Sequence, residues 1–130
     1  MPRRTIEQFR QERARGQERL LACDHLGLKR FLRLDAACYE DGPLPARTKE
    51  LLGLVASAVL RCNDCIDYHL EQCVKLDYAR EEIIDALNVA LIVGGSIFIP
   101  HLRHAVMSLD ELLDERVPRA NQRKRTKKGR

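Results

Sequence analysis

The sequence predicts an all-α protein of about six helices that form one main domain. Over most of its 130 residues, apolar side chains recur at intervals of three and four, as they do along one face of a helix. No segment alternates apolar and polar residues between turn signals, which argues against β-hairpins. Hydrophobic residues make up 45% of the chain, enough to build a single core.

Three helices are expected in the N-terminal half. Residues 5–22 are rich in Arg, Glu, Gln and Ala, and their few apolar side chains predict a polar helix that packs only lightly. Gly27 is expected to break the chain, and a second helix then ends before Asp41. Pro45 suits the start of a third helix over residues 46–60, the first with a strongly apolar face.

Three more helices are expected in the C-terminal half. Asn63 can cap the start of the fourth helix, and residues 79–93 form the clearest amphipathic helix of the chain. The final helix should begin between Ser96 and His101 and end before Pro118.

These elements divide the chain into three regions. They are a polar N-terminal helix (residues 1–24), a helical domain (25–116) and a basic disordered tail (117–130). The tail carries seven of the 23 Lys and Arg residues and no acid, so the net charge of +4 belongs to the tail rather than to the domain. Because no aromatic residue lies among these bases to stack on a nucleotide, we do not expect nucleic-acid binding. Wide apolar faces in so short a chain predict self-association.

We expect a cytoplasmic protein with no membrane partner. The longest apolar stretch, residues 90–99, is interrupted by Gly94, Gly95 and Ser96, whereas a membrane-spanning helix needs about 20 apolar residues. The N-terminus is charged and lacks the apolar core of a secretory signal.

The chain has five cysteines, an odd number that argues against a closed disulfide framework of the secreted kind. Three of them stand apart. Cys73 lies among the apolar positions of its helix, and we expect it to pack as a small buried hydrophobic residue. We expect the same of Cys23 and Cys38.

The other two cysteines form a pattern that suggests chemistry. Cys62 and Cys65 are three positions apart and His69 follows four positions later, so that on a helix all three lie close to one face. A helix N-terminus favours a thiolate, and a nearby imidazole can accept its proton. The pattern is that of a redox-active dithiol that needs no other cofactor. Ile66 stands where covalent haem attachment would require His, which excludes that reading.

Four further residues are candidates for supporting roles. Glu50, on the preceding helix, is either a base that passes protons to the dithiol through water or an ordinary solvated residue. His101 and His104 can reach the dithiol to tune its pKa or bind substrate, from the same or a neighbouring subunit, or they merely cap or pack at a helix start. Arg103 can bind an anionic substrate or pair with an acid.

A zinc module is an alternative from another class. Cys62, Cys65, His69 and one of His101 or His104 make a four-ligand set that suits zinc. A structural zinc site usually stabilises a scaffold that lacks a core, whereas this chain has abundant helical core of its own. We therefore prefer the redox interpretation and expect no bound metal.

Taken together, Glu50, Cys62, Cys65 and His69 resemble the signature of the alkyl hydroperoxidase D-like group within the carboxymuconolactone decarboxylase family. Two flanking segments are also similar, residues 47–52 and 81–95. The resemblance covers about residues 28–113.

The resemblance implies an all-helical homotrimer or homohexamer that reduces peroxides or small disulfides by dithiol cycling in antioxidant defence. By this analogy Cys65 attacks the peroxide, Cys62 resolves the sulfenic acid, Glu50 and His69 relay protons, and a dithiol reductant protein restores the thiols. Helix electrostatics alone favours Cys62, nearer the N-terminus, as the attacking thiol, so the two roles stay open.

One position departs from the pattern. Hydroperoxidase members often have a histidine just before the second cysteine, whereas this chain has Asp64, whose negative charge opposes thiolate formation. This difference predicts weak peroxidase activity. The decarboxylase branch generally lacks the paired cysteines, so a carboxymuconolactone decarboxylase-like lyase is the remaining alternative and fits the chain less well.

Overall fold

The computed structural model describes residues 2–128, with side chains for residues 2–116. This part of the chain contains six α-helices, one short 3₁₀ helix and no strand, which confirms the predicted all-α fold. In order they are α1 (Ile6–Ala22), α2 (Leu26–Cys38), α3 (Ala46–Val59), α4 (Asn63–Lys75), α5 (Arg80–Gly94), η1 (Ser96–Phe98) and α6 (Ile99–Lys128). Within the described residues, no helix combines the length and the apolar character that crossing a membrane requires.

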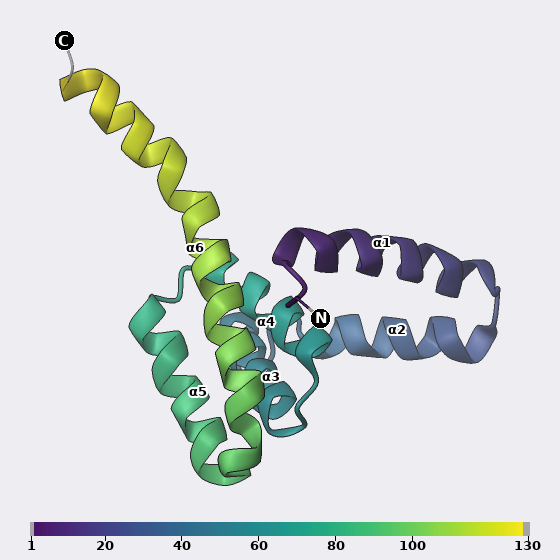
Figure 1. Ribbon diagram of the computed structural model, residues 1–130. Helices are drawn as coiled ribbons and strands as arrows, with labels where there is room; N and C mark the ends of the chain where they lie inside the picture. Colours follow the sequence, from purple (N-terminus) through teal and green to yellow (C-terminus); the bar gives the residue numbers. More distant parts are fainter. Residues whose placement is uncertain (1, 129–130) are drawn as a thin grey trace.

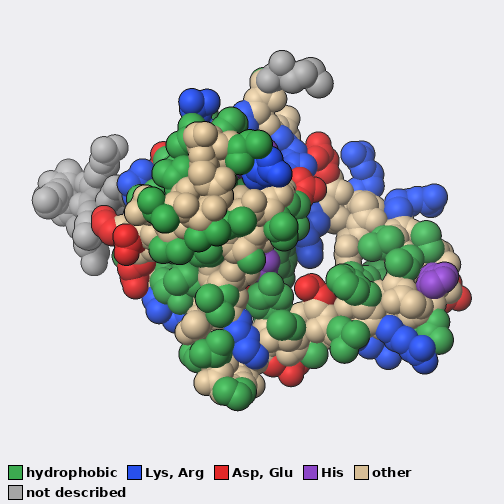
Figure 2. Space-filling model, turned by 90° about the horizontal axis from the view of Figure 1, so that it is seen from below, with side chains coloured by type: hydrophobic (Ala, Val, Ile, Leu, Met, Phe, Trp, Pro, Cys, Tyr) green, Lys and Arg blue, Asp and Glu red, His purple; other side chains and the backbone are tan. Residues whose placement is uncertain are grey.

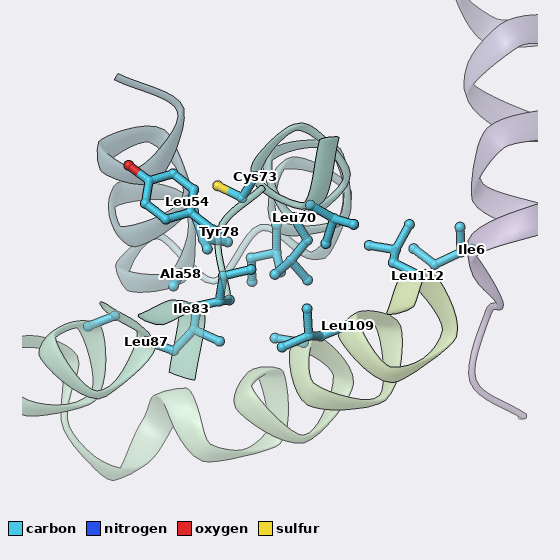
Figure 3. Close-up of a cluster of buried hydrophobic side chains, with 14 of the residues drawn as sticks. Ile6, Leu54, Ala58, Leu70, Cys73, Tyr78, Ile83, Leu87, Leu109 and Leu112 are labelled. Carbon is cyan, nitrogen blue, oxygen red and sulfur yellow. The ribbon is translucent and has the colours of Figure 1, made fainter. Parts of the chain in front are cut away.

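Helices α3 to α6 form a bundle around the hydrophobic core (Figures 1 and 3). Helix α4 packs against both α3 and α6, and α3 also packs against α5. The fully buried side chains include one or more from each of these helices: Leu54, Ala58, Ile66, Leu70, Ile83, Leu87 and Leu109. Burying a Leu or Ile side chain contributes about 1.5–3 kcal/mol, so this apolar face fixes α4 in place. The N-terminus of α4, which carries the paired cysteines, lies at the edge of this core.

Helices α1 and α2 run side by side in opposite directions and project from the bundle as an arm, residues 6–38 (Figure 1). The first turn of α1 is anchored in the bundle by Ile6 and Phe9, its two buried side chains. Arg10 adds a bidentate contact to Glu115 of α6, at 2.7 and 2.8 Å, and a 2.6 Å hydrogen bond to Glu71 of α4. Helix α2 has no buried residue. The expectation of light packing is therefore confirmed for α1, and α2, for which it was not predicted, packs more lightly still.

The break between α1 and α2 lies at Asp24, and the expectation that Gly27 makes it is wrong. Asp24 has a φ of 49°, in the left-handed region that Asp tolerates better than most residues. His25 then caps α2, because its Nδ1 accepts the backbone N–H of Leu28 at 3.4 Å. Gly27 consequently lies inside α2.

Helix α6 continues past the position where the sequence predicts its end. It was expected to stop before Pro118, but it runs from Ile99 to Lys128. The residues after Pro118 are mainly Arg, Lys, Gln and Ala, which have good helix propensity. The helical backbone thus enters the segment predicted to be a disordered tail. The side chains of residues 117–130 lie outside the described set, and the domain boundaries stay predictions.

Candidate functional site

The two paired cysteines lie at the turn that joins α3 to α4. Arg61, with a φ of 59°, reverses the chain after α3, and Cys62 is the N-cap of α4. The Cys62 Sγ accepts the backbone N–H of Cys65 at 3.3 Å, and the two Sγ atoms are 2.7 Å apart. Both are free thiols, and the sequence spacing brings their sulfur atoms into contact at the start of α4.

Glu50 and His69 form a buried pair between α3 and α4. The Nδ1 of His69 lies 2.8 Å from Oε2 of Glu50, and each residue is only 7% exposed. Because a carboxylate only accepts, Nδ1–H is the donor, and a neutral imidazole then carries its lone pair on Nε2. The Tyr39 hydroxyl, 3.4 Å from Nε2, points at that lone pair. The structure thus places Glu50 as a partner of His69 rather than as a solvated surface residue.

Gly53 makes this pair possible. A Cβ at Gly53 would lie 2.7 Å from Cε1 and 2.9 Å from Nε2 of His69, and 2.9 Å from the Tyr39 hydroxyl. Such distances are shorter than real side chains tolerate, so the imidazole can lie against α3 only where α3 has no side chain. Gly53 follows Glu50 by almost one helical turn, which puts the carboxylate and the open surface on the same side of α3.

A cavity of about 490 Å³ opens beside Cys65. Its walls come from α1, α2, α4 and Arg4, and they include Tyr68 and His69 as well as Cys65. No hydrogen bond among the described residues joins His69 to either thiol, but the imidazole and the Cys65 thiol border the same space. Cys62 is not part of the cavity wall.

Burial raises the pKa of Cys65 to about 11, with further contributions from the hydrogen bond to Cys62 and the charges of Cys62, Asp64 and Asp35. At neutral pH the Cys65 thiol therefore holds its proton until a base or a neighbouring positive charge favours its loss. Cys73 is buried in the core, and burial raises the pKa of its thiol to about 12, in agreement with the expected packing role.

Cys23 and Cys38 are exposed, so the expectation that they are buried is wrong. Cys23 follows the end of α1, and Cys38 ends the unburied helix α2. The apolar character of a cysteine could not reveal this exposure, because it does not indicate that the helices of the arm lie outside the bundle.

The candidate residues of α6 lie in three different surroundings. His101 donates from Nδ1 to Oδ1 of Asn63 at 2.9 Å. Asn63 is the first residue of α4 and follows Cys62 in the sequence. His104 is buried and donates from Nε2 to Asp67, at 2.9 and 3.0 Å from its two carboxylate oxygens. Arg103 is exposed.

Sequence reasoning missed Asp67 and Tyr39. Asp67 is fully buried, and it precedes the buried residues Leu70 and Val74 by three and seven positions. That spacing puts it on the buried face of α4 and is the signal that could have identified it. Tyr39 lies 30 positions before His69 in the sequence, and no local pattern links them.

The four residues of the zinc alternative are not gathered into one site. Among the residues with described side chains, no group of three or more His, Cys, Asp or Glu is placed to hold a metal ion. The three histidines are directed to separate partners: His69 to Glu50, His101 to Asn63 and His104 to Asp67.

Comparison with known proteins identifies relatives in sequence and structure. Residues 27–111 match the carboxymuconolactone decarboxylase family. An uncharacterized protein encoded in the cox locus of Paracoccus denitrificans is 30% identical over 82 residues, 63% of this chain and 74% of its own length. An uncharacterized protein of Cupriavidus necator is 29% identical over 76 residues, 58% of this chain and 67% of its own length.

The fold also matches solved structures. A Thermotoga maritima crystal structure superposes with a TM-score of 0.82 and 52% identity, over 85% of this chain and 96% of that chain. A second Thermotoga maritima structure has a TM-score of 0.77 and 53% identity, over 82% and 90% of the two chains, and is described as a carboxymuconolactone decarboxylase family protein with a suggested involvement in the antioxidative response. A Legionella pneumophila protein of the same family, 24% identical with a TM-score of 0.76 over 82% and 96% of the two chains, shares the fold. The chain belongs to the carboxymuconolactone decarboxylase family.

Proposed function

We propose that the protein is a thiol-dependent peroxidase or disulfide oxidoreductase that acts in antioxidant defence by cycling Cys62 and Cys65. The observation that carries the proposal is the 2.7 Å approach of the two thiols at a helix N-terminus, beside the buried Glu50–His69 pair. The suggested antioxidative involvement of the Thermotoga maritima relative, at 53% identity, supports it.

In the proposed cycle Cys65 attacks the substrate, because Cys65 borders the cavity and Cys62 does not. The Nε2 of His69 takes the Cys65 proton through water, and the thiolate attacks the terminal peroxide oxygen. The O–O bond breaks, Cys65 becomes a sulfenic acid, and the leaving alkoxide receives the proton from His69. The Cys62 thiol then attacks the Cys65 sulfur, which forms the disulfide and releases water.

Two electrons from an external dithiol return the enzyme to its starting state. A dithiol reductant protein exchanges with the Cys62–Cys65 disulfide and leaves in its own oxidised form. The cycle needs no metal or organic cofactor. A cytoplasmic setting, where thiols are kept reduced, suits this requirement.

The test compares Cys62→Ser and Cys65→Ser in multiple-turnover peroxide reduction with thioredoxin, thioredoxin reductase and NADPH as the reducing system, because excess dithiothreitol reduces a sulfenic acid directly and bypasses Cys62. Each variant should lose turnover, because neither can close the disulfide. Cys38→Ser, at an exposed site outside the cavity, is the matched control and should keep full activity. Full turnover in either Cys62→Ser or Cys65→Ser would refute the dithiol mechanism.

Thiol counting by alkylation and mass spectrometry gives a second readout. One equivalent of peroxide should remove two thiols, mapped to a Cys62–Cys65 link. A zinc ion that copurifies with the protein and protects these thiols from peroxide would instead favour the metal module.

A further inference from the structure

Asp64 lies between the two cysteines in the sequence and places a negative charge near the Cys65 thiol. Its side chain is 68% exposed and lies at the first turn of α4, one residue before Cys65. After burial and the neighbouring Cys62, the charge of Asp64 raises the pKa of Cys65 further. A dithiol enzyme that works through a thiolate therefore needs something to offset this carboxylate.

Arg4 supplies a positive charge at this point. It lies in the segment that leads into α1, and its guanidinium makes an ion pair with Oδ1 of Asp64. The same terminal nitrogen, Nη2, also lies 3.6 Å from Oδ2 of the buried Asp67. The other terminal nitrogen donates to Glu12 at 2.9 Å, and the guanidinium carbon lies 5.1 Å from the ring centre of Phe9. These contacts hold the guanidinium against the start of α4.

We propose that Arg4 is a positioning residue of the dithiol site, which holds the Asp64 carboxylate in an ion pair so that it does not oppose the Cys65 thiolate. The inference rests on the proposed function, because a role for the Cys65 thiolate gives Arg4 its purpose. The pH at which Cys65 becomes reactive can nevertheless be measured without any peroxide. Arg4 precedes the part of the chain that matches the family model, residues 27–111.

Other charged or titratable groups also face the region of Cys65. In the cavity wall they are Glu12 and Arg13 on α1, Asp35 on α2, and Tyr68 and His69 on α4. Outside the wall, Cys62 contacts Cys65 from the N-cap of α4, Glu50 on α3 pairs with His69, and His101 on α6 pairs with Asn63. Arg13 is the other cation of the cavity wall, and its guanidinium lies 4.7 Å from the ring centre of Tyr68. Arg4 differs from Arg13 in that it contacts Asp64 directly, so its effect on Cys65 should pass through that carboxylate.

The experiment measures the rate of iodoacetamide alkylation at Cys65 against pH in the reduced full-length protein, with the site of modification mapped by mass spectrometry. Arg4→Met should move the pH midpoint upward by roughly 0.5–1 unit, which is a three- to tenfold slower alkylation at neutral pH, because it frees the Asp64 charge. Asp64→Asn should move the midpoint downward. In the Asp64→Asn background, Arg4→Met should have little effect, because the carboxylate through which Arg4 acts is gone.

Arg3→Met is the matched control for simple loosening of the N-terminal segment. Arg3 lies in the same segment but makes an ion pair with Glu111 and donates to Ser108 at 3.2 Å, both on α6. The Arg3→Met substitution should leave the pH midpoint of Cys65 alkylation unchanged. An unchanged midpoint in Arg4→Met would overturn the proposal, as would an equal shift in Arg3→Met or an undiminished effect of Arg4→Met in the Asp64→Asn background.

Peroxide turnover is measured separately on the same proteins. If the midpoints shift as expected while the unsubstituted protein shows no turnover, the proposed function fails and the role of Arg4 stands. If turnover is present and the midpoints do not shift, the proposed function stands and the role of Arg4 fails.

Discussion

His69 is held by side chains from three parts of the chain. Glu50 of α3 accepts its Nδ1–H, Tyr39 at the end of α2 reaches its Nε2, and the Tyr68 ring packs edge-on at 5.2 Å between ring centres. These contacts fix both the tautomer and the orientation of the imidazole. When Nε2 takes a proton from the cavity, only the Tyr39 hydroxyl has to turn away, while Glu50 and Tyr68 keep the ring in place.

The Glu50→Gln substitution tests the relay at the level of one charge. Glutamine keeps an oxygen that can accept the Nδ1–H of His69, but it removes the negative charge that stabilises the imidazolium. We expect the rate constant for reaction with peroxide to fall by about 10- to 100-fold, and the acid limb of the pH–rate profile to move to lower pH. Stopped-flow kinetics across pH, with thermal unfolding as a check on the fold, measures both.

Tyr39→Phe provides the comparison for Glu50→Gln. It removes only the 3.4 Å contact to Nε2, a long hydrogen bond, and we expect a rate change below about threefold. If Glu50→Gln leaves the pH–rate profile unchanged, Glu50 has no part in the relay.

At the residue scale, the sequence was informative where residues share a helix or a known spacing. The grouping of Cys62, Cys65 and His69 follows from helical periodicity, whereas Glu50 had two open interpretations until the family resemblance favoured the relay role. The Asp64–Arg4 contact joins positions 60 apart in the sequence, so it depends on where the arm docks. Local periodicity contains no information on such a contact.

At the scale of elements, the approach of α3 to α4 depends on Gly53. We predict that Gly53→Ala lowers stability by about 1–3 kcal/mol, because the new methyl overlaps a ring that Glu50 and the core hold in place. Peroxide activity should fall with it, since any relief moves His69 or the Tyr39 hydroxyl. Urea denaturation and turnover measurements check the two effects.

Gly16→Ala is the matched control, because a Cβ at Gly16 of α1 would meet nothing within 4 Å. It should stabilise α1 by about 0.5–1 kcal/mol through helix propensity alone. Because Gly16 lines the cavity beside Cys65, this variant is a control for stability and not for activity. If Gly53→Ala behaves like Gly16→Ala, the close approach at Gly53 has no role in placing His69.

Helix positions were predictable wherever the helix faces the core. The predicted ranges 46–60 and 79–93 match α3 and α5 to within about one residue at each end. The turn at Asp24 and the continuation of α6 past Pro118 were not predicted, because glycine and proline propensities are weak compared with capping and context. The arm was predicted as two helices, but nothing in their periodicity indicated that α2 would leave the bundle.

At the scale of the whole molecule, the arm presents an apolar surface that no other part of the described chain covers. Helix α2 has 13 residues, a length that is marginal for an isolated helix in water, and none of them is buried. Phe31 and Leu34 are 68% and 70% exposed, and Figure 2 shows hydrophobic side chains gathered on the arm. Exposed apolar surface of this kind is typical of an interface. A second copy of the chain is the partner we expect, in the homotrimer or homohexamer that the family resemblance implies.

We predict that Phe31→Glu and Leu34→Glu dissociate this oligomer, because each places a charge in an apolar contact that self-association would bury. Sedimentation velocity should give a trimer or hexamer for the unsubstituted protein and smaller species for both variants. Arg15→Gln, an exposed substitution on α1 that lowers the net charge by the same one unit, is the control and should leave the oligomer intact. A monomeric unsubstituted protein would contradict the prediction outright. An oligomer that survives both substitutions would place the interface elsewhere, and the exposed apolar residues of α5, Val89, Ile92 and Val93, are then the next surface to test.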